Sequence, residues 1–208
     1  MENALLVVAH PRRDSLTAEV AGRTSQRLTG YDVDVLDLYA EGFDPRLTPP
    51  DEPDWTDRDK VYSAEVREHM RRIDAADLIV VVFPVWWYGL PAILKGWIDR
   101  VWNYGFAYGR SKARLGEKRM LWLGLAGESQ ESYAEHGLND MLSRQLQIGI
   151  SNYCGIEDVS VRFIYGTVEN GSAALAAADN ALAELTRGAP RDGHEQPGRT
   201  PDHGLAPQ

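Results

Sequence analysis

The chain has 208 residues, of which 43% are hydrophobic and 25% are charged, and this predicts a single domain with one substantial core. Its formal net charge of -9 argues against a surface that gathers nucleic acid or anionic lipid, because such surfaces need clustered Lys and Arg. The single cysteine, Cys154, excludes an internal disulfide. Because no signal peptide and no run of transmembrane length is recognised, we expect a cytoplasmic protein without membrane insertion.

Short β-branched runs alternate with stretches of helical periodicity. The predicted strands are 5–8, 33–38, 78–83, 120–125 and 159–164, and the predicted helices are 15–28, 58–73, 91–102, 138–153 and 172–186. The third strand is apolar at every position, as expected for a central strand covered on both faces. The pattern therefore predicts an α/β fold with a doubly wound, five-stranded parallel sheet of flavodoxin-like order 2-1-3-4-5.

Two stretches depart from this alternation. Residues 41–57 hold four prolines and many acidic side chains, which predicts a surface loop without a helix or strand. Residues 188–208 have almost no large apolar side chains to offset the entropy of ordering, so we expect a disordered tail after a domain that spans 1–187.

The fold class indicates where a ligand binds, because open parallel sheets bind ligands at the carboxyl ends of their strands, where the strand order reverses. After the first strand, His10, Arg12, Ser15 and Thr17 lead into a helix whose free N–H groups suit a phosphate. An ordinary helix cap at Ser15 and an ordinary strand-end residue at His10 fit the same residues.

Two further loops are expected at this edge. Residues 84–91 (PVWWYGLP) form a proline-bracketed aromatic loop on which a flat heteroaromatic ring could stack, although each aromatic could equally be a core or dimer contact. Residues 124–129 contain two glycines that would let the backbone approach a planar ligand.

The loop after the third predicted strand and the helix that follows it carry a family resemblance. The run 83–101 (FPVWWYGLPAILKGWIDRV), followed by Phe106-Ala107-Tyr108, resembles the flavodoxin-like NAD(P)H:quinone oxidoreductases. The likeness extends through the fifth predicted strand and includes His10-Pro11 with Ser15, residues 37–40 (DLYA) and Tyr153-Cys154-Gly155. This family includes the DT-diaphorase type and ancillary oxidoreductases of bacterial potassium efflux.

The resemblance implies tightly bound FAD or FMN, NADH or NADPH as hydride donor, a quinone-like acceptor and a homodimer. It places His136 as the histidine that stabilises flavin charge, with Tyr133 nearby, and Tyr108 and Tyr153 against the acceptor. The implied flavin-binding residues are His10, Ser15, Leu16, Thr17, Ala18, Pro84, Val85, Trp86, Trp87, Tyr88, Gly124, Leu125, Ala126 and Gly127. The chain departs from the family pattern at Leu123-Gly124-Leu125-Ala126-Gly127, where Thr-Thr-Gly-Gly is usual, and at Gln130, where a tyrosine is usual.

Other conspicuous residues have simpler interpretations. We expect Lys95 and Arg100 on an exposed or interface face of their helix, and Cys154 as a buried small hydrophobe. Trp97 and Trp102 are interpreted as packing residues, although together with Phe106 and Tyr108 they are more aromatic than one small core requires, which favours a dimer contact. No metal site is expected.

Three other functions compete with quinone reduction. Reduction of azo or nitro compounds would use the same site, and a regulatory flavoprotein subunit of a potassium-efflux transporter would use the same fold. An electron carrier of the flavodoxin kind is disfavoured, because the tryptophan-rich loop would cover the ring edge that a carrier must expose.

Overall fold

The structure is a computed structural model that describes residues 1–57, 59–109, 114–168 and 171–187. The tail predicted to be disordered, 188–208, lies outside the described residues, so that prediction and the domain boundary at 187 stay predictions.

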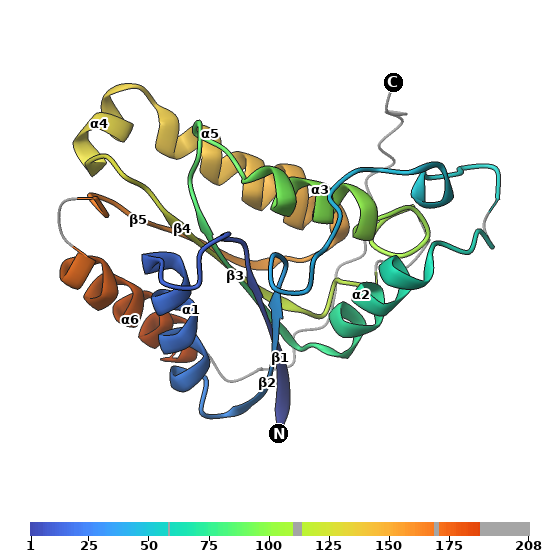
Figure 1. Cartoon of the computed structure of the whole chain (residues 1–208), viewed down its shortest axis with the longest axis horizontal. Coiled ribbons are helices and arrows are strands. Elements are labelled where there is room, and N and C mark those ends of the chain that lie inside the picture. The colour runs from blue at the N-terminus through green and yellow to red at the C-terminus, as the bar shows by residue number, and fades with distance from the viewer. Residues whose placement is uncertain (58, 110–113, 169–170, 188–208) are drawn as a thin grey trace, which may run out of the picture.

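The sheet is the centre of the molecule (Figure 1). Its strands are β1 (Glu2–Val8), β2 (Tyr31–Asp37), β3 (Leu78–Pro84), β4 (Arg119–Leu125) and β5 (Asp158–Ile164). They pair in parallel in the order β2-β1-β3-β4-β5, with Val8 opposite Val82 and Phe83 opposite Gly124. The predicted fold class and strand order are confirmed, and the order reverses between β1 and β3.

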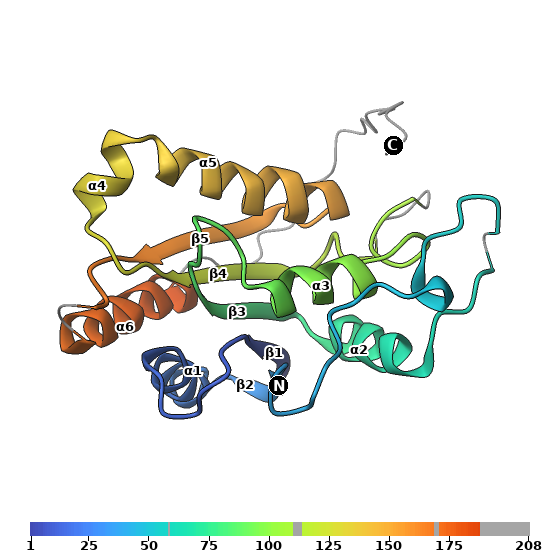
Figure 2. The same ribbon diagram turned by 45° about the horizontal axis from the view of Figure 1, so that its top comes forward.

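Helices cover both faces of the sheet (Figure 2). One face packs against α1 (Leu16–Arg27) and α6 (Gly171–Arg187), and the other against α2 (Ala64–Ala75), α3 (Ala92–Val101) and the helical segment after α5 (Leu138–Arg144). The continuous apolar run of β3 follows directly, because Ile79 and Val81 enter one core while Val80 and Val82 enter the other.

The helices differ in detail from the predicted ones. The predicted helix 138–153 is α5 followed by a π-helix, η2 (Gln145–Ser151), and a 3₁₀ turn, η3 (Asn152–Cys154). The Ser151 hydroxyl donates to the carbonyl oxygen of Leu146 at 2.8 Å and receives the Trp122 Nε1–H at 2.9 Å, so a buried side chain takes part in the wider turn. The structure also adds a short helix, α4 (Gln130–Glu135), which begins at the Ser129 cap.

The prediction that residues 41–57 lack any helix was also wrong, since η1 (Pro49–Asp51) is a 3₁₀ helix within them. Proline suits the first position of a helical turn, because the N–H that it lacks would have no partner there. The predicted helix 58–73 begins later, at Ala64, where the Ser63 hydroxyl accepts a hydrogen bond from the Val66 N–H.

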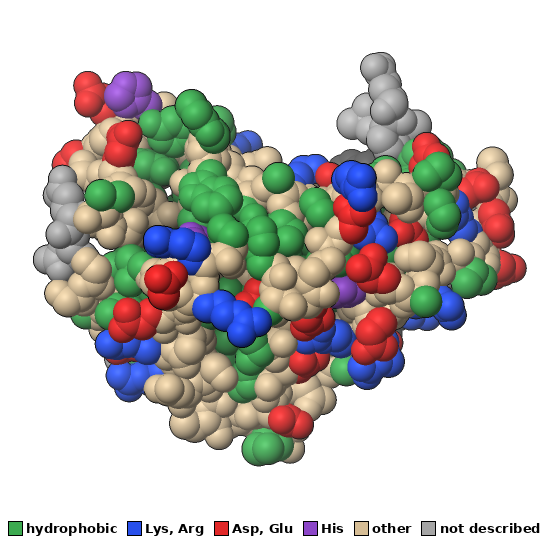
Figure 3. All heavy atoms as spheres, viewed as in Figure 1, with side chains coloured by type: hydrophobic (Ala, Val, Ile, Leu, Met, Phe, Trp, Pro, Cys, Tyr) green, Lys and Arg blue, Asp and Glu red, His purple; other side chains and the backbone are tan. Residues whose placement is uncertain are grey.

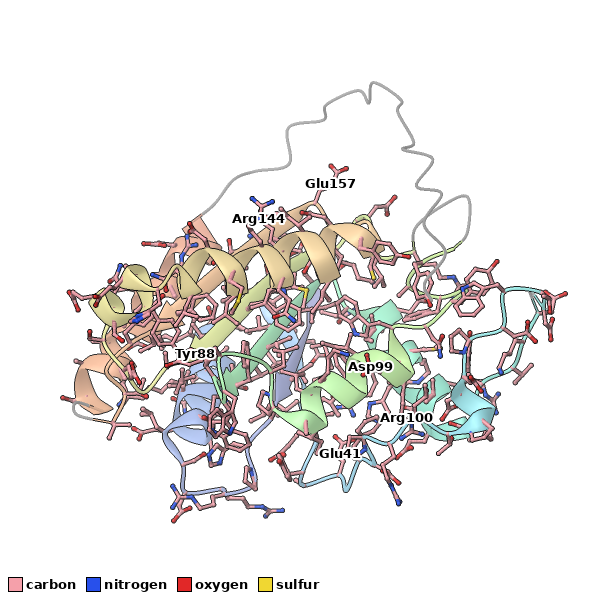
Figure 4. The ribbon with its side chains drawn as sticks, turned by 90° about the horizontal axis from the view of Figure 1, so that it is seen from above. Glu41, Tyr88, Asp99, Arg100, Arg144 and Glu157 are labelled. Carbon is pink, nitrogen blue, oxygen red and sulfur yellow. The ribbon has the colours of Figure 1, made fainter. Side chains whose placement is uncertain are left out.

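Residues 41–51, which we call the anchored segment, are fixed to α3. Asp51 is 0% exposed, and its carboxylate pairs with Arg100 at 2.7 Å and accepts the Ser63 N–H at 2.8 Å. Arg100 also pairs with Glu65 at 2.8 Å, and Figure 4 shows it on α3. A Cβ on Gly96 would lie 2.2 Å from the Pro45 carbonyl oxygen, so the segment packs directly on the α3 backbone.

These contacts correct two expectations. Arg100 is 4% exposed, so placing it on an exposed or interface face of its helix was wrong, whereas Lys95 on the same helix is exposed and pairs with Asp99. Trp97, Trp102 and Phe106 are all buried in the chain's own core. Their packing role is confirmed, and these three rings no longer argue for a dimer.

The single cysteine is buried. Cys154 lies in the core as expected, and burial raises the pKa of its thiol to about 12.

No helix in the described part of the chain is long and apolar enough to cross a membrane.

Candidate functional site

Three loops meet at the carboxyl edge of the sheet, as the strand order requires. The His10 ring, after β1, lies 5.8 Å from the Trp86 ring, after β3. The Val85 N–H donates to the Leu125 carbonyl oxygen at 2.8 Å, which ties the loop after β3 to the end of β4. Figure 3 shows hydrophobic side chains gathered on the face that carries these loops, with basic side chains beside them.

The loop after β1 delivers the amino end of α1 to this edge. The Ser15 hydroxyl accepts the Ala18 N–H at 3.1 Å, so the helix-cap interpretation of Ser15 is confirmed. Its hydroxyl hydrogen can still donate to a ligand. His10 Nδ1 accepts the Arg12 N–H at 3.1 Å, which fixes the bend between strand and helix. Thr17 is buried, so its hydroxyl is less accessible than the sequence suggested.

Residues 86–89, which we call the aromatic turn, have a strained backbone. Trp86 and Gly89 exchange two backbone hydrogen bonds, at 3.3 and 3.0 Å, which close a two-residue turn. The central residues Trp87 and Tyr88 have φ of 51° and 53°, values that cost a residue with a side chain about 1–2 kcal/mol each. Trp87 is nevertheless 98% exposed, so a large apolar ring is held in the solvent at the place where the fold binds ligands.

The loop after β4 differs from its prediction. A Cβ on Gly124 would lie 2.7 Å from the Phe163 ring and 3.1 Å from Val85, so packing within the chain explains this glycine without a ligand. The Ala126 N–H donates to Ile164 at 2.8 Å, so it is not available to a ligand as the sequence suggested. Leu125 and Ala126 are buried, and Gly127 is the more accessible glycine of the loop.

Two tyrosines, one from α4 and one that follows β5, pack behind the aromatic turn. The Tyr133 ring, from α4, contacts Tyr88 at 5.5 Å and Tyr165 at 5.2 Å between ring centroids. Burial raises the pKa of Tyr133, and it raises the pKa of Tyr165, which follows β5, to about 12. The sequence-based reasoning missed Tyr165, although the same strand-end rule would have pointed to the residues after β5.

His136 lies exposed at the carboxyl end of α4, where its Nδ1–H donates to the Ser132 carbonyl oxygen at 3.0 Å. This contact orients the ring and leaves Nε2 as the nitrogen without a partner in this contact. The contact from α4 to the aromatic turn is made by Tyr133 and not by His136.

Tyr108 and Tyr153 form a pair elsewhere on the chain. Their ring centroids are 5.5 Å apart, and Tyr153 is exposed. The aromatic turn precedes α3 whereas Tyr108 follows it, and ten helical residues span about 15 Å. The length of α3 therefore lies between the aromatic turn and the segment that carries Tyr108.

Comparisons with known proteins agree with this geometry. The Flavodoxin_2 family, described by its flavodoxin-like fold, matches residues 2–189. Over 80% of this chain and 85% of the relative, the sequence is 46% identical to "Uncharacterized NAD(P)H oxidoreductase YcaK" of Escherichia coli (strain K12). It is 28% identical to "NAD(P)H dehydrogenase [quinone] 1" of Cavia porcellus, over 80% of this chain and 69% of the relative.

A solved structure, "NAD(P)H:quinone oxidoreductase from Methanothermobacter marburgensis", matches with a TM-score of 0.80 and 27% identity, over 92% of this chain and 98% of that one. The chain therefore belongs to the Flavodoxin_2 family and is an oxidoreductase. The resemblance to NAD(P)H:quinone oxidoreductases noted in the sequence is confirmed.

Proposed function

We propose that this oxidoreductase binds FMN or FAD at the junction of the three loops and transfers a hydride from NADH or NADPH to a quinone-like acceptor. The observation that carries the proposal is the aromatic turn, which holds Trp87 98% exposed on a strained backbone at the switch point of the sheet. A planar ring stacked there would cover the exposed indole. Relatives named for NAD(P)H and quinone support the choice of substrates.

Each part of the site has a distinct task in this proposal. The amino end of α1 holds the flavin phosphate through backbone N–H groups and the Ser15 hydroxyl, beside the exposed Arg12 and Arg13. Trp86, Trp87 and Tyr88 stack on the ring and exclude water. A bound flavin supplies the two-electron chemistry that no side chain of the chain can supply.

His136 and Tyr133 are proposed to serve the reaction differently. His136, whose ring the Ser132 carbonyl orients, would stabilise through Nε2 the negative charge that hydride transfer would bring to a bound flavin. Tyr133 is 3% exposed, so its contribution is to support the Tyr88 ring through the contact between the two rings.

The assembly is proposed to be a homodimer in the cytoplasm, in which Tyr108 and Tyr153 complete the partner's acceptor site. The distance that α3 sets between this pair and the loops of its own chain supports the exchange. Met141, Ile148 and Tyr153 are exposed along α5, η2 and η3 and offer an apolar surface for a second copy. Sedimentation of Ile148→Glu tests the surface: a monomer with reduced quinone reduction is expected, and an unchanged dimer would contradict it.

The test of the whole proposal is flavin binding by the purified chain. We expect flavin absorbance, or uptake of added FMN or FAD, together with oxidation of NADH or NADPH that depends on menadione. A folded protein that takes up neither flavin would overturn the proposal.

A matched pair of cap variants localises the site. Ser15→Ala and Ser63→Ala each remove a side chain that caps a helix, at a cost of about 0.5–2 kcal/mol. Ser63→Ala also removes the hydrogen bond that the hydroxyl donates to Asp51 at 3.0 Å, so it should destabilise the fold more. Only Ser15→Ala should also weaken flavin affinity, because only α1 begins at the switch point. Equal flavin affinity in both variants would place the phosphate elsewhere.

A further inference from the structure

Three tyrosine rings link the aromatic turn to the end of β5 and the first turn of α5. We call Tyr88, Tyr133 and Tyr165 the tyrosine chain; their successive centroid distances are 5.5 and 5.2 Å, and both contacts have an interplanar angle of 64°. The three rings come from the turn after β3, from α4 and from the residue that follows β5. Figure 4 labels Tyr88 on the aromatic turn, at the exposed end of the tyrosine chain.

The far end of the tyrosine chain is fixed by a hydrogen bond. The Tyr165 hydroxyl donates to Asn139 Oδ1, in the first turn of α5. Burial keeps this phenol protonated, since it raises the pKa of Tyr165 to about 12, and the donor therefore persists across the physiological pH range. Tyr133, in the middle, is 3% exposed and cannot move without displacing its neighbours.

The aromatic turn needs such support because its backbone is unfavourable. Trp87 and Tyr88 both have positive φ, and Trp87 has almost no packing to offset that cost. Of the two strained residues, Tyr88 is the one whose ring packs on the protein, through Tyr133. The conformation that exposes Trp87 therefore depends on a contact made by its neighbour.

The tyrosine chain also lies outside the two main cores. Tyr133 belongs to a small separate cluster with Ala126 and Leu142, against which Val85 and Tyr165 pack. Weakening this cluster would leave the packing of α1, α2, α3 and α6 on the sheet intact. A change at Tyr165 can thus alter the turn without unfolding the protein.

We propose that Tyr165 is a positioning residue, which acts through Tyr133 and Tyr88 to hold the aromatic turn in the strained form that presents Trp87 to the flavin. The proposal rests on the proposed flavin site. Tyr165 would thus affect flavin binding without touching the flavin.

A double-mutant cycle separates positioning from a general loss of stability. Tyr165→Phe removes the hydroxyl and keeps the ring, and it should weaken flavin affinity about threefold to tenfold, the factor that corresponds to one hydrogen bond. In a Tyr88→Gly background, where glycine adopts positive φ without strain and the ring contact is gone, the same substitution should change the affinity less than twofold. Equal effects in both backgrounds would overturn the proposal.

The control is Tyr31→Phe, at the opposite end of the sheet, which removes a hydroxyl that accepts from Arg119 at 3.2 Å. It should leave flavin affinity unchanged. If Tyr165→Phe does not fold, Asn139→Ala removes the same hydrogen bond from the other side and should give the same affinity loss.

A second measurement needs no flavin. With 5-fluorotryptophan incorporated and the Trp87 resonance assigned by Trp87→Phe, the fluorine spectrum of the flavin-free protein reports the turn directly. We expect Tyr165→Phe to shift or broaden the Trp87 resonance and leave those of buried Trp97 and Trp122 in place. An unchanged Trp87 resonance would refute the positioning role, whereas failure of the wild-type protein to bind flavin would refute the proposed function alone.

Discussion

The two segments that flank α3 in the fold are held by opposite means. The anchored segment is fixed to the helix by a buried ion pair, with Asp51 and Arg100 both almost inaccessible to solvent. The aromatic turn leads into the same helix with a strained backbone and a tryptophan that is 98% exposed. One segment buries its charges, and the other exposes its largest apolar ring.

The difference in burial separates a structural segment from the segment proposed to bind the flavin. A buried ion pair is costly to disrupt because the charge left behind has no solvent, so the anchored segment is a fixed support for α3. An exposed ring on a strained backbone contributes little to the fold, and the flavin proposed above would account for it. Substitutions in the two segments should therefore affect different properties, stability in the first and ligand affinity in the second.

The largest effect is expected from Arg100→Met. It leaves the Asp51 carboxylate buried without its cation and should lower the free energy of unfolding by about 3–5 kcal/mol, as measured by urea denaturation. Lys95→Met is the control on the same helix, because its exposed pair with Asp99 contributes about 0.5 kcal/mol or less. Similar losses in the two variants would show that the buried pair has no special role.

A pair of glycine substitutions tests the packing of the anchored segment. Gly96→Ala should destabilise the protein by about 1–3 kcal/mol, because the new methyl group would meet the Pro45 backbone at 2.2 Å. Gly22→Ala, in α1, meets nothing within 4 Å and should stabilise by about 0.4–1 kcal/mol. Thermal unfolding of both variants checks the opposite signs, and a neutral Gly96→Ala would mean that the segment can move away.

The reverse behaviour is expected at the aromatic turn. Trp87→Ala should change the free energy of unfolding by less than about 0.5 kcal/mol, because the side chain makes almost no contacts. Flavin affinity should fall by about 0.5–1.5 kcal/mol, the value of one aromatic contact. Fluorescence titration with FMN and FAD measures this, and a variant with unchanged affinity but lower stability would reverse the comparison.

The smallest predicted effect is a loss of stability in acid through His69, which packs against the anchored segment. His69 receives the Trp97 Nε1–H on Nδ1 at 3.3 Å and packs against Phe43, and burial lowers its pKa from 6.5, with Arg72 adding to the effect. Arg100 acts in the same direction, while the carboxylates of Glu41 and Glu65 oppose it. The folded protein therefore keeps His69 neutral while the unfolded chain takes up a proton.

Because the unfolded state binds more protons, the stability that His69 contributes is complete above about pH 6.5 and is lost as the pH falls toward its folded pKa. Urea unfolding of the wild type and His69→Gln between about pH 7 and pH 5 should show a smaller acid-induced loss in the variant. Parallel curves would mean that His69 is not the group responsible.

The sequence by itself determined the architecture and which loops meet at one edge of the sheet. The apolar run of β3 predicts a strand buried on both faces, and the alternation of strands and helices predicts the order that brings the loops after β1, β3 and β4 together. Both follow from periodicity, which is local. The aromatic residues of the turn were recognised for the same reason, since they lie next to each other in the chain.

Only the tertiary structure decided which neighbours these residues have. The sequence could not predict that Arg100 is buried against Asp51, 49 residues away, or that Gly124 is small because Phe163 lies across it. Nor could it predict the positive φ of Trp87 and Tyr88, because neither residue type favours that conformation and the support comes from Tyr133 and Tyr165. The partners of Arg100, Gly124 and Tyr88 come from segments distant in the sequence. A local pattern of apolar residues predicts which elements are buried, but it does not identify these partners.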